Sequence, residues 1–386
     1  MPNVISNVPA PRNEPVLDYA PNSPERRSLE QSLGEMYGSE IEIPAVIGGR
    51  GVETGVLEDC TSPHEHRHRL GVHHRAGPTE VDAAIQAAAE AKGPWKAMPW
   101  EARASIFLKA AELLAGPWRD RMNAAAMLGI SKTVHQAEID AVCELVDFFR
   151  FNVAYMEQIY RMQPESGRGV WNRSVKRPLD GFVLAVSPFN FVSIAANLPA
   201  APAMMGNTVV WKPASSAVFV AHHVMALLEE AGLPPGVINL VPARGRDVSD
   251  VVFEHPDLAG LHFTGGTDTF RRMWKSMAGN VERYRSWPRI AGETGGKDFV
   301  FVHGSADVDA VTAALIRGAF EYQGQKCSAA SRVYVPESLW PGLRERLLDD
   351  LQRVRVGDPR DFRNFMGAVI DRTAFERIMR YIESCR

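Results

Sequence analysis

The stretch FVLAVSPFNF, residues 182–191, decides the fold of this 386-residue chain. Its first half is apolar and a proline-containing turn follows, which predicts a short strand buried on both faces. Similar apolar runs recur at residues 208–211, 237–241 and 260–263, and segments with helical spacing lie between them at 193–205, 215–231 and 247–254. Strands that alternate with helices in this way predict an α/β fold with a parallel sheet and a crevice at the carboxyl ends of its strands.

The sequence on either side of this sheet divides the chain into three parts. Residues 1–40 are rich in Pro, Asn and Ser, which suits an arm packed on the surface of a larger body. Residues 41–294 contain the predicted sheet, and residues 295–386 begin a second α/β series. Because one hydrophobic core rarely serves so long a chain, we expect two domains after the arm.

Helical spacing dominates the segment that precedes the sheet. Helices are predicted to begin at Pro78 and to cover 101–115, 118–129 and 134–162. The pair Phe148-Phe149 within the last of these is typical of core packing. Residues 162–180 predict an excursion from the body, with a strand-like piece at 170–175. In the last part we expect strands at 298–302 and 331–335, a helix at 307–320 and a helical segment within 363–386.

Composition and charge exclude several classes of function. The chain is 45% hydrophobic and 23% charged with a formal net charge of -3, so we expect neither nucleic acid nor a membrane as a partner. No pattern of a signal peptide is seen, which favours a cytoplasmic location. Histidines crowd residues 64–74 but alternate with arginine, which favours a solvated strand and turn, and we expect no metal. Reduced thiols rather than disulfides are expected of the widely spaced cysteines, Cys60, Cys143, Cys327 and Cys385.

Three side chains from separate segments carry the chemistry. Cys327 lies in GQKCS between a polar turn and a β-branched strand, Asn190 follows the first strand, and Glu293 lies among glycines in GETGGK. A thiol, a carboxamide donor and a carboxylate are the groups needed for covalent catalysis at a carbonyl carbon. Taken singly, an asparagine in a turn or a surface glutamate would be ordinary. The prediction therefore depends on the three together.

A second group of residues lies where two of the strands end. Lys212 follows the strand 208–211, where an amine could hydrogen-bond ribose hydroxyls. Gly265-Gly266-Thr267 follows the strand 260–263, where glycines let the backbone approach a phosphate at a helix N-terminus. The turn departs from the usual Gly-x-Gly-x-x-Gly pattern because Phe270 takes the last place. A surface lysine and an ordinary turn explain each signal alone, but together at one sheet edge they favour a dinucleotide site.

The motifs SPFNF, WKP, FTG, GETGGK and GQKCS, in this order, resemble the aldehyde dehydrogenase superfamily. More narrowly, they resemble its L-glutamate γ-semialdehyde (1-pyrroline-5-carboxylate) dehydrogenases, whose N-terminal arm is similar to NEPV at 13–16 and SPER at 23–26. The resemblance implies a Rossmann-like cofactor domain, an aldehyde dehydrogenase-like catalytic domain and an excursion at 162–180 used in oligomerisation. It further implies oxidation of L-glutamate γ-semialdehyde to L-glutamate with NAD in proline catabolism, by a homo-oligomer with proline dehydrogenase as a candidate partner.

The resemblance also implies roles for individual residues. Cys327 would attack the aldehyde carbon, Asn190 and the Cys327 N–H would hold the oxyanion, and Glu293 would activate the water that releases the product. The residues expected at the substrate are Ser328, which would grip the α-carboxylate, Phe191 and Glu144. Those expected at the cofactor are Ser187, Lys212, Ser215, Gly265, Gly266, Thr267, Asp268 and Thr269.

Three departures from the family pattern affect these expectations. Ser215 stands where many NAD-preferring relatives carry an acidic residue, so a 2′-phosphate is not repelled and NADP use is possible. Gly266 replaces a serine that is common after Phe-Thr-Gly. Family members also continue beyond the position of Arg386 through a Glu-x-Phe-Gly-Pro segment, a substrate-anchoring loop and an oligomerisation strand. If the chain ends at Arg386, we expect an incomplete catalytic domain with exposed apolar surface, poor folding, doubtful oligomerisation and little or no activity.

Other functions also fit parts of the sequence. Another semialdehyde dehydrogenase would share the same motifs. A cofactor-independent cysteine hydrolase could use Cys327 and Asn190, but Lys212 and Gly265 count against it because a hydrolase needs no dinucleotide crevice. A truncated, non-catalytic subunit that associates with intact partners is the third alternative.

Overall fold

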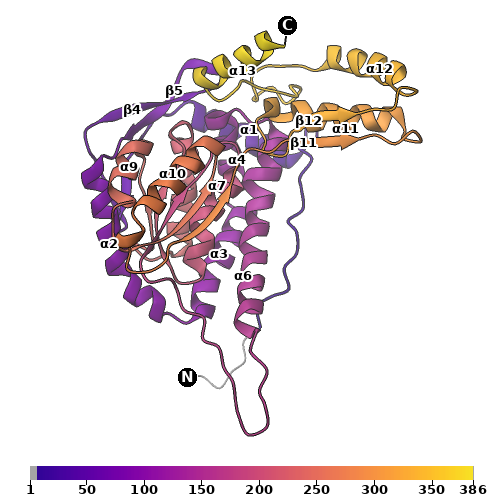
Figure 1. Cartoon of the computed structure of the whole chain (residues 1–386). Helices are drawn as coiled ribbons and strands as arrows, with labels where there is room; N and C mark the ends of the chain where they lie inside the picture. The colour runs from indigo at the N-terminus through magenta and orange to yellow at the C-terminus, as the bar shows by residue number, and fades with distance from the viewer. Residues whose placement is uncertain (1–6, 386) are drawn as a thin grey trace.

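The computed structural model describes residues 7–385, and a seven-stranded sheet lies at its centre (Figure 1). The strand order is β10-β9-β6-β7-β8-β2-β3. The parallel strands are β6 (Phe182–Val186), β7 (Thr208–Lys212), β8 (Ile238–Leu240), β9 (Leu258–Thr264) and β10 (Arg289–Glu293). The antiparallel edge consists of β2 (Ala45–Ile47) and β3 (Arg50–Val52). The predicted parallel sheet is confirmed, whereas β10 and the antiparallel edge were not predicted.

The direction in which strands are added reverses beside β6. Strands β7 and β8 follow on one side of β6, whereas β9 and β10 lie on its other side, so Val183 is paired with Val209 and with Gly260. Ligands of doubly wound sheets bind in the crevice outside the carboxyl ends of the strands at this switch point. The loop after β6 and the turn after β9 therefore border the same crevice.

Helices cover both faces of the sheet because the side chains of β6 alternate between two apolar cores. Leu184 packs into one core, and Val183 and Ala185 pack into the other. The first core is closed by α2 (Pro78–Ala97), α9 (Gly245–Val252) and α10 (Thr267–Gly279). The second is closed by α3 (Trp100–Ala115), α4 (Arg119–Ile130), α7 (Val192–Met204) and α8 (Val218–Ala231).

The helical block before the sheet forms as predicted, with one difference. Helix α2 begins at Pro78, where Glu80 accepts a 2.7 Å hydrogen bond from the Gly77 N–H and so caps the first turn. The predicted helix 134–162 consists of three pieces: α5 (Val134–Ala137), a π-helical segment η1 (Glu138–Glu144) and α6 (Leu145–Arg161). The wider π turn changes the directions in which its carboxylates point.

The predicted N-terminal arm contains a helix, α1 (Pro24–Tyr37), which packs against α4. The Ser23 hydroxyl caps this helix by accepting a hydrogen bond from the Arg26 N–H at 3.3 Å. Before the helix, Glu14 forms a 2.7 Å ion pair with Arg119 of α4, which ties the extended part of the arm to the body. Residues 1–6 of the predicted arm and Arg386 lie outside the described residues.

The predicted excursion at 162–180 projects from the body as a long loop (Figure 1). The expected strand at 170–175 is wrong, since this described segment has no strand. Side chains join its two arms instead: Gln163 accepts a hydrogen bond from the Ser174 N–H at 2.8 Å and donates one to the Ser174 carbonyl at 3.2 Å. The Asn172 amide also donates to the Glu165 carbonyl at 2.7 Å, so side-chain bonds take the place of a backbone ladder.

Two smaller sheets complete the structure. The first sheet, β1-β5-β4, consists of β1 (Ile41–Ile43), β4 (Leu57–Ser62) and β5 (Glu65–His74). The strand favoured for the histidine-rich segment is confirmed as β5, but it is not solvated throughout, because His73 and His74 are buried. The second pairs β11 (Asp298–Phe301) with β12 (Ala330–Tyr334) in parallel, with α11 (Val308–Phe320) between them as predicted. Helix α12 (Trp340–Arg353) follows, and α13 (Arg372–Ser384) begins later than the predicted segment 363–386 because Asp371 caps it.

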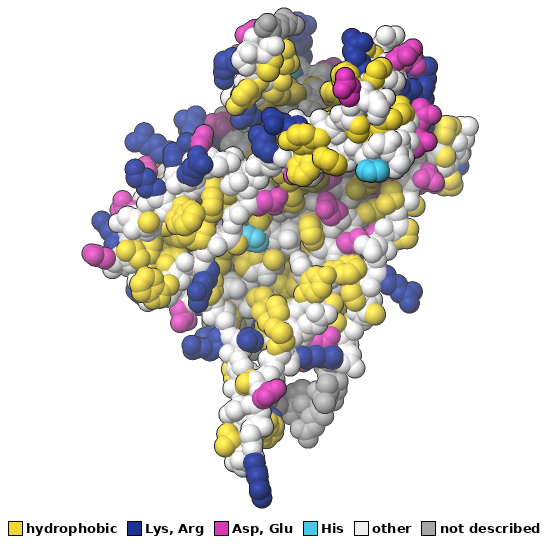
Figure 2. All heavy atoms as spheres, turned by 45° about the vertical axis from the view of Figure 1, so that its right-hand side comes forward, with side chains coloured by type: hydrophobic (Ala, Val, Ile, Leu, Met, Phe, Trp, Pro, Cys, Tyr) yellow, Lys and Arg dark blue, Asp and Glu magenta, His cyan; other side chains and the backbone are white. Residues whose placement is uncertain are grey.

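The β11-β12 sheet lies in the upper part of the molecule with α11 and α12 (Figure 1). Phe299 and Phe301 of β11 are 64% and 75% exposed, so apolar surface is present here, as expected. Figure 2 shows hydrophobic side chains in several groups over this side of the molecule. Within residues 7–385, no helix combines the length and the apolar character needed to cross a membrane.

Candidate active site

A cysteine, a glutamate and an asparagine from three elements lie beyond the carboxyl end of the sheet. Glu293 is the last residue of β10, Asn190 lies in the loop after β6, and Cys327 lies between the turn η4 (Glu321–Gly324) and β12. The carboxylate of Glu293 lies close enough to the Cys327 thiol to raise its pKa. The Asn190 amide donates a 2.9 Å hydrogen bond to the carbonyl of Gln325, two residues before the cysteine. The structure thus brings together the three residues that the sequence indicated.

Some groups around Cys327 raise the pKa of its thiol and others lower it. Burial raises the pKa of Cys327, and the hydrogen bond and negative charge of Glu293 raise it further. The backbone N–H groups of Ser328 and of Cys327 itself lower this pKa, because they donate to the sulfur. The sulfur therefore has a carboxylate that can take its proton and amides that can stabilise the thiolate.

Glycines beside these residues make the close packing possible. A Cβ at Gly292 would lie 2.2 Å from the ring of Phe270, and a Cβ at Gly296 would lie 2.0 Å from the carbonyl oxygen of Cys327. Both distances are far below van der Waals contact. A backbone hydrogen bond also joins the ends of β9 and β10, since the Gly265 N–H donates to the Glu293 carbonyl at 3.2 Å. The glycines of GETGGK thus let this segment lie directly against the cysteine.

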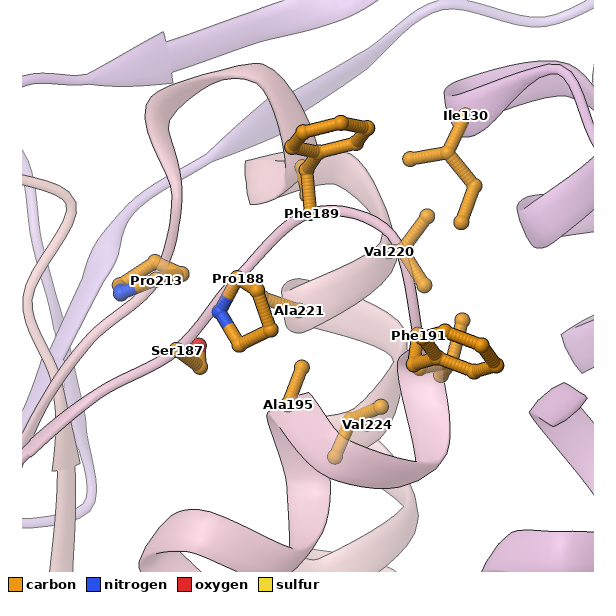
Figure 3. Close-up of a pocket in the computed structure, with 12 residues that line it drawn as sticks. Ile130, Ser187, Pro188, Phe189, Phe191, Ala195, Pro213, Val220, Ala221 and Val224 are labelled. Carbon is orange, nitrogen blue, oxygen red and sulfur yellow. The ribbon is translucent and has the colours of Figure 1, made fainter. Parts of the chain in front are cut away.

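The loop that carries Asn190 rests on a packed apolar base (Figure 3). Phe189 and Pro188 of the loop lie against Val220 and other side chains of α8. The space left between them is only about 10 Å³, roughly the size of one water-sized probe, so it is not a ligand site. This packing fixes the backbone from which Asn190 projects.

A larger cavity of about 360 Å³ lies beside Glu293. Glu144 lines it, and one of its carboxyl oxygens lies 2.8 Å from the Ser193 hydroxyl oxygen. Burial raises the pKa of Glu144. Of the other predicted substrate residues, Phe191 lies against Lys132, 4.5 Å from the ammonium to the ring centroid, and Ser328 is exposed. Sequence reasoning missed further lining residues, namely Phe148, Ile194, Asn197 and His262.

The predicted cofactor residues lie at the switch point of the sheet. Burial lowers the pKa of Lys212 to about 8, and its ammonium donates to the neighbouring Pro213 carbonyl at 3.0 Å. The Ser187 N–H already donates to the Lys212 carbonyl at 3.1 Å, and its hydroxyl accepts from Trp211 at 2.9 Å. The Ser187 hydroxyl keeps its own proton as a donor. Ser215 starts a short turn and is exposed.

The turn after β9 forms the N-terminus of helix α10. Gly266 is its N-cap, and Thr267, Asp268 and Thr269 make up the first turn. A Cβ at Gly265 would lie 2.8 Å from the Phe263 ring, whereas a Cβ at Gly266 would meet nothing closer than 3.9 Å. The first glycine is thus required by packing, while the second position has room for the serine that it lacks.

The sequence and the structure are similar to those of known enzymes. The model of the aldehyde dehydrogenase family matches residues 53–386. The chain is 46% identical over 382 residues to the delta-1-pyrroline-5-carboxylate dehydrogenase of Agaricus bisporus, which covers 98% of this chain and 70% of that protein. The delta-pyrroline-5-carboxylate dehydrogenase of Mycobacterium tuberculosis, solved with NAD, is 54% identical with a TM-score of 0.97, covering 99% of this chain and 72% of that one. Proline utilization A from Bdellovibrio bacteriovorus is 29% identical with a TM-score of 0.90, covering 99% and 40%.

Proposed function

The chain belongs to the aldehyde dehydrogenase family, and we propose that it oxidises L-glutamate γ-semialdehyde, formed from 1-pyrroline-5-carboxylate, to L-glutamate with NAD. The observation that carries this proposal is that Glu293, which lines a cavity, acts on the Cys327 thiol, while Asn190 is hydrogen-bonded to Gln325, two residues before that cysteine. The relatives named pyrroline-5-carboxylate dehydrogenases, which include those that are 46% and 54% identical, support the choice of substrate.

The cofactor edge of the sheet fits a dinucleotide. The N-terminus of α10 offers backbone N–H donors to a pyrophosphate, and Gly266 at its N-cap leaves open space beside them. Lys212, largely buried with a pKa of about 8, keeps most of its charge at neutral pH and can donate to ribose hydroxyls. We assign the adjoining Ser187, Ser215, Gly266, Thr267, Asp268 and Thr269 to the same site. When bound, NAD would supply the acceptor for the hydride.

The residues of this chain supply the covalent chemistry. The carboxylate of Glu293 takes the thiol proton of Cys327, and the sulfur then attacks the aldehyde carbon. The amide of Asn190 and the N–H of Cys327 donate to the oxygen as it gains negative charge. After oxidation of the carbon, the sulfur holds the acyl group as a thioester. Glu293 must first pass the thiol proton on to solvent. Its carboxylate then accepts a proton from water, whose oxygen attacks the thioester, and the Cys327 sulfur leaves as a thiolate as glutamate is released.

The cavity beside Glu293 supports the position of the substrate. Glu144 lines it, and we assign this carboxyl, whose pKa is raised by burial, to the wall that faces the substrate. We assign Ser328 to the α-carboxylate and Phe191 to the wall between substrate and protein core. We further propose that residues 41–294 form the cofactor domain and 295–386 the catalytic domain. The sheet topology supports this division, since β11-β12 is separate from the seven-stranded sheet.

We base two proposals about partners on the loop at 162–180 and on the similarity to proline utilization A. The loop at 162–180 carries Trp171, 75% exposed, which suits contact with a second copy of the chain and a homo-oligomer. The similarity to proline utilization A supports proline dehydrogenase as a partner that delivers substrate. Because Ser215 carries no charge, we also propose that NADP is accepted beside NAD.

The test is NADH formation by this 386-residue chain with 1-pyrroline-5-carboxylate, beside Cys327→Ala and the matched control Cys385→Ala. Cys385 is an exposed thiol outside the site, so its loss should leave the rate unchanged. Turnover that disappears only with Cys327 supports the proposal. Faster turnover with succinate semialdehyde would indicate another semialdehyde dehydrogenase. Folded, NAD-binding protein without turnover would favour the non-catalytic alternative.

A further inference from the structure

Lys132 is a buried cation between the two loops that carry Asn190 and Cys327. Its side chain is 1% exposed, and its ammonium lies 2.8 Å from a carboxylate oxygen of Asp140. The same ammonium lies 4.5 Å from the ring centroid of Phe191 and 4.5 Å from that of Tyr322. A buried ammonium is costly unless it is paired, so these contacts hold Lys132 in one place.

On one side of Lys132, its partner Asp140 fixes the start of helix α7. The Asp140 carboxylate accepts hydrogen bonds from the N–H groups of Val192 and Ser193 at 2.9 and 3.0 Å, and from the Ser193 hydroxyl at 2.7 Å. These are the first two residues of the helix, and Asn190 and Phe191 directly precede them. A carboxylate at a helix N-terminus is favourable, and here it anchors the end of the Asn190 loop.

On the other side, Lys132 contacts the turn that leads to the cysteine. Tyr322 is fully buried, and its hydroxyl donates to the Ile130 carbonyl at 2.8 Å. Tyr322 and Gln323 both have positive φ, 53° and 57°, which residues with side chains adopt only when their surroundings impose it. The cation against the Tyr322 ring is one of the contacts that impose this conformation, in the turn that leads directly to Cys327.

From these contacts we propose that Lys132 is a positioning residue for the reaction. Together with Asp140 it fixes the Asn190 loop and the turn before Cys327 relative to each other. The amide of Asn190 then faces the oxygen of a substrate bonded to the Cys327 sulfur. This inference rests on the proposed function only in the identity of the nucleophile and of the oxyanion donor, so it can be tested without the natural substrate.

The experiment compares two reactions of the Cys327 sulfur in the wild type, Lys132→Met and Asn190→Ala. Acylation by p-nitrophenyl acetate forms a sulfur–carbon bond, passes through an oxyanion and expels p-nitrophenolate. Alkylation by iodoacetamide forms a sulfur–carbon bond and expels iodide without any oxyanion. Alkylation is followed on the peptide that contains Cys327, with the exposed Cys385 as an internal reference.

The ratio of the acylation rate to the alkylation rate tests whether Lys132 positions the oxyanion donor. Loss of an oxyanion donor typically costs about 10²–10³ in rate, so we expect both variants to lower the ratio at least about tenfold. A Lys132→Met ratio within about threefold of the wild type would overturn the proposal. Circular dichroism and thermal unfolding of each variant check that it is folded, because unfolding would expose the thiol and speed its alkylation. A decrease of the ratio between these limits is compared with the decrease in Asn190→Ala. If the logarithm of the decrease in Lys132→Met is less than half of that in Asn190→Ala, the result counts against the proposal.

A second variant guards against misfolding. Lys132→Met alone leaves the Asp140 carboxylate buried without its cation, which is strongly destabilising. The double variant Lys132→Met/Asp140→Asn removes both charges while the asparagine oxygen can still accept from the α7 amides. The same ratio criterion applies to it. If the wild type shows the ester reaction but forms no NADH, the proposed function fails while this inference is still tested.

Discussion

The side-chain amide of Asn190 donates a 2.9 Å hydrogen bond to the carbonyl oxygen of Gln325 and so ties the loop after β6 to the turn before the candidate nucleophile. An asparagine amide has two N–H donors. One is used in this contact, and the other remains for a substrate oxygen. The same side chain can thus position the loop and stabilise an oxyanion.

Replacement of Asn190 by alanine should lower kcat by about 10²–10³, because the oxyanion loses a preorganised donor. NAD affinity, measured by tryptophan fluorescence quenching, should stay the same, since Asn190 is not assigned to the cofactor. The rate is measured as NADH absorbance with saturating substrate. A kcat within about threefold of the wild type would exclude Asn190 as the oxyanion donor.

Replacement of Glu293 by glutamine should move the pH profile of Cys327 alkylation to lower pH. The hydrogen bond and charge of Glu293 both raise the pKa of the thiol, so their removal increases the thiolate fraction at a given pH. Steady-state NADH formation should nevertheless fall by about 10²–10⁴, because the general base toward water is lost. An unmoved or upward-shifted alkylation profile would contradict the Cys327–Glu293 contact.

Replacement of Ser215 by glutamate should reduce kcat/KM with NADP by at least about tenfold and leave that with NAD nearly unchanged. A carboxylate at this exposed position would repel a 2′-phosphate, whereas it can accept a hydrogen bond from a 2′-hydroxyl. Both constants are measured on the same preparation. Equal changes with the two cofactors would show that Ser215 does not lie near the 2′ position.

The stability of the protein should depend on pH through His64. Burial lowers the pKa of His64 to about 4; Asp358 and Glu65 act in the opposite direction, while Arg360 and His68 lower it further. In the unfolded chain the pKa is about 6.5, so between these values the unfolded state binds more protons. The free energy of unfolding should therefore fall as the pH drops from about 6.5 to 4, by on the order of 2–3 kcal/mol.

Urea unfolding of His64→Gln at pH 4.5 and 7 tests this contribution. The difference between the two pH values should be smaller than in the wild type by on the order of 2 kcal/mol. His66→Gln is the matched control, because His66 is exposed two residues away and should leave the difference unchanged. Identical pH dependence in His64→Gln and the wild type would contradict the burial of a neutral His64.

Much of the fold was readable because its signals are local. The apolar run 182–186 and its repeats predicted strands, and β6, β7, β8 and β9 lie where they were expected. The edge β2-β3 escaped prediction because strands of three residues carry too little periodicity. The strand expected at 170–175 failed for a different reason: no neighbouring strand pairs with this segment among the described residues.

The sequence by itself determined the parallel sheet and the identities of Cys327, Glu293 and Asn190, since residue types with rare chemistry stand in characteristic local motifs. Only the tertiary structure decided which residues surround them. Phe148, expected in the core, lines the cavity with His262, and Lys132 is buried between two aromatic rings. The reason is physical: burial and contact depend on segments far apart in the chain, brought together by packing that no local pattern records.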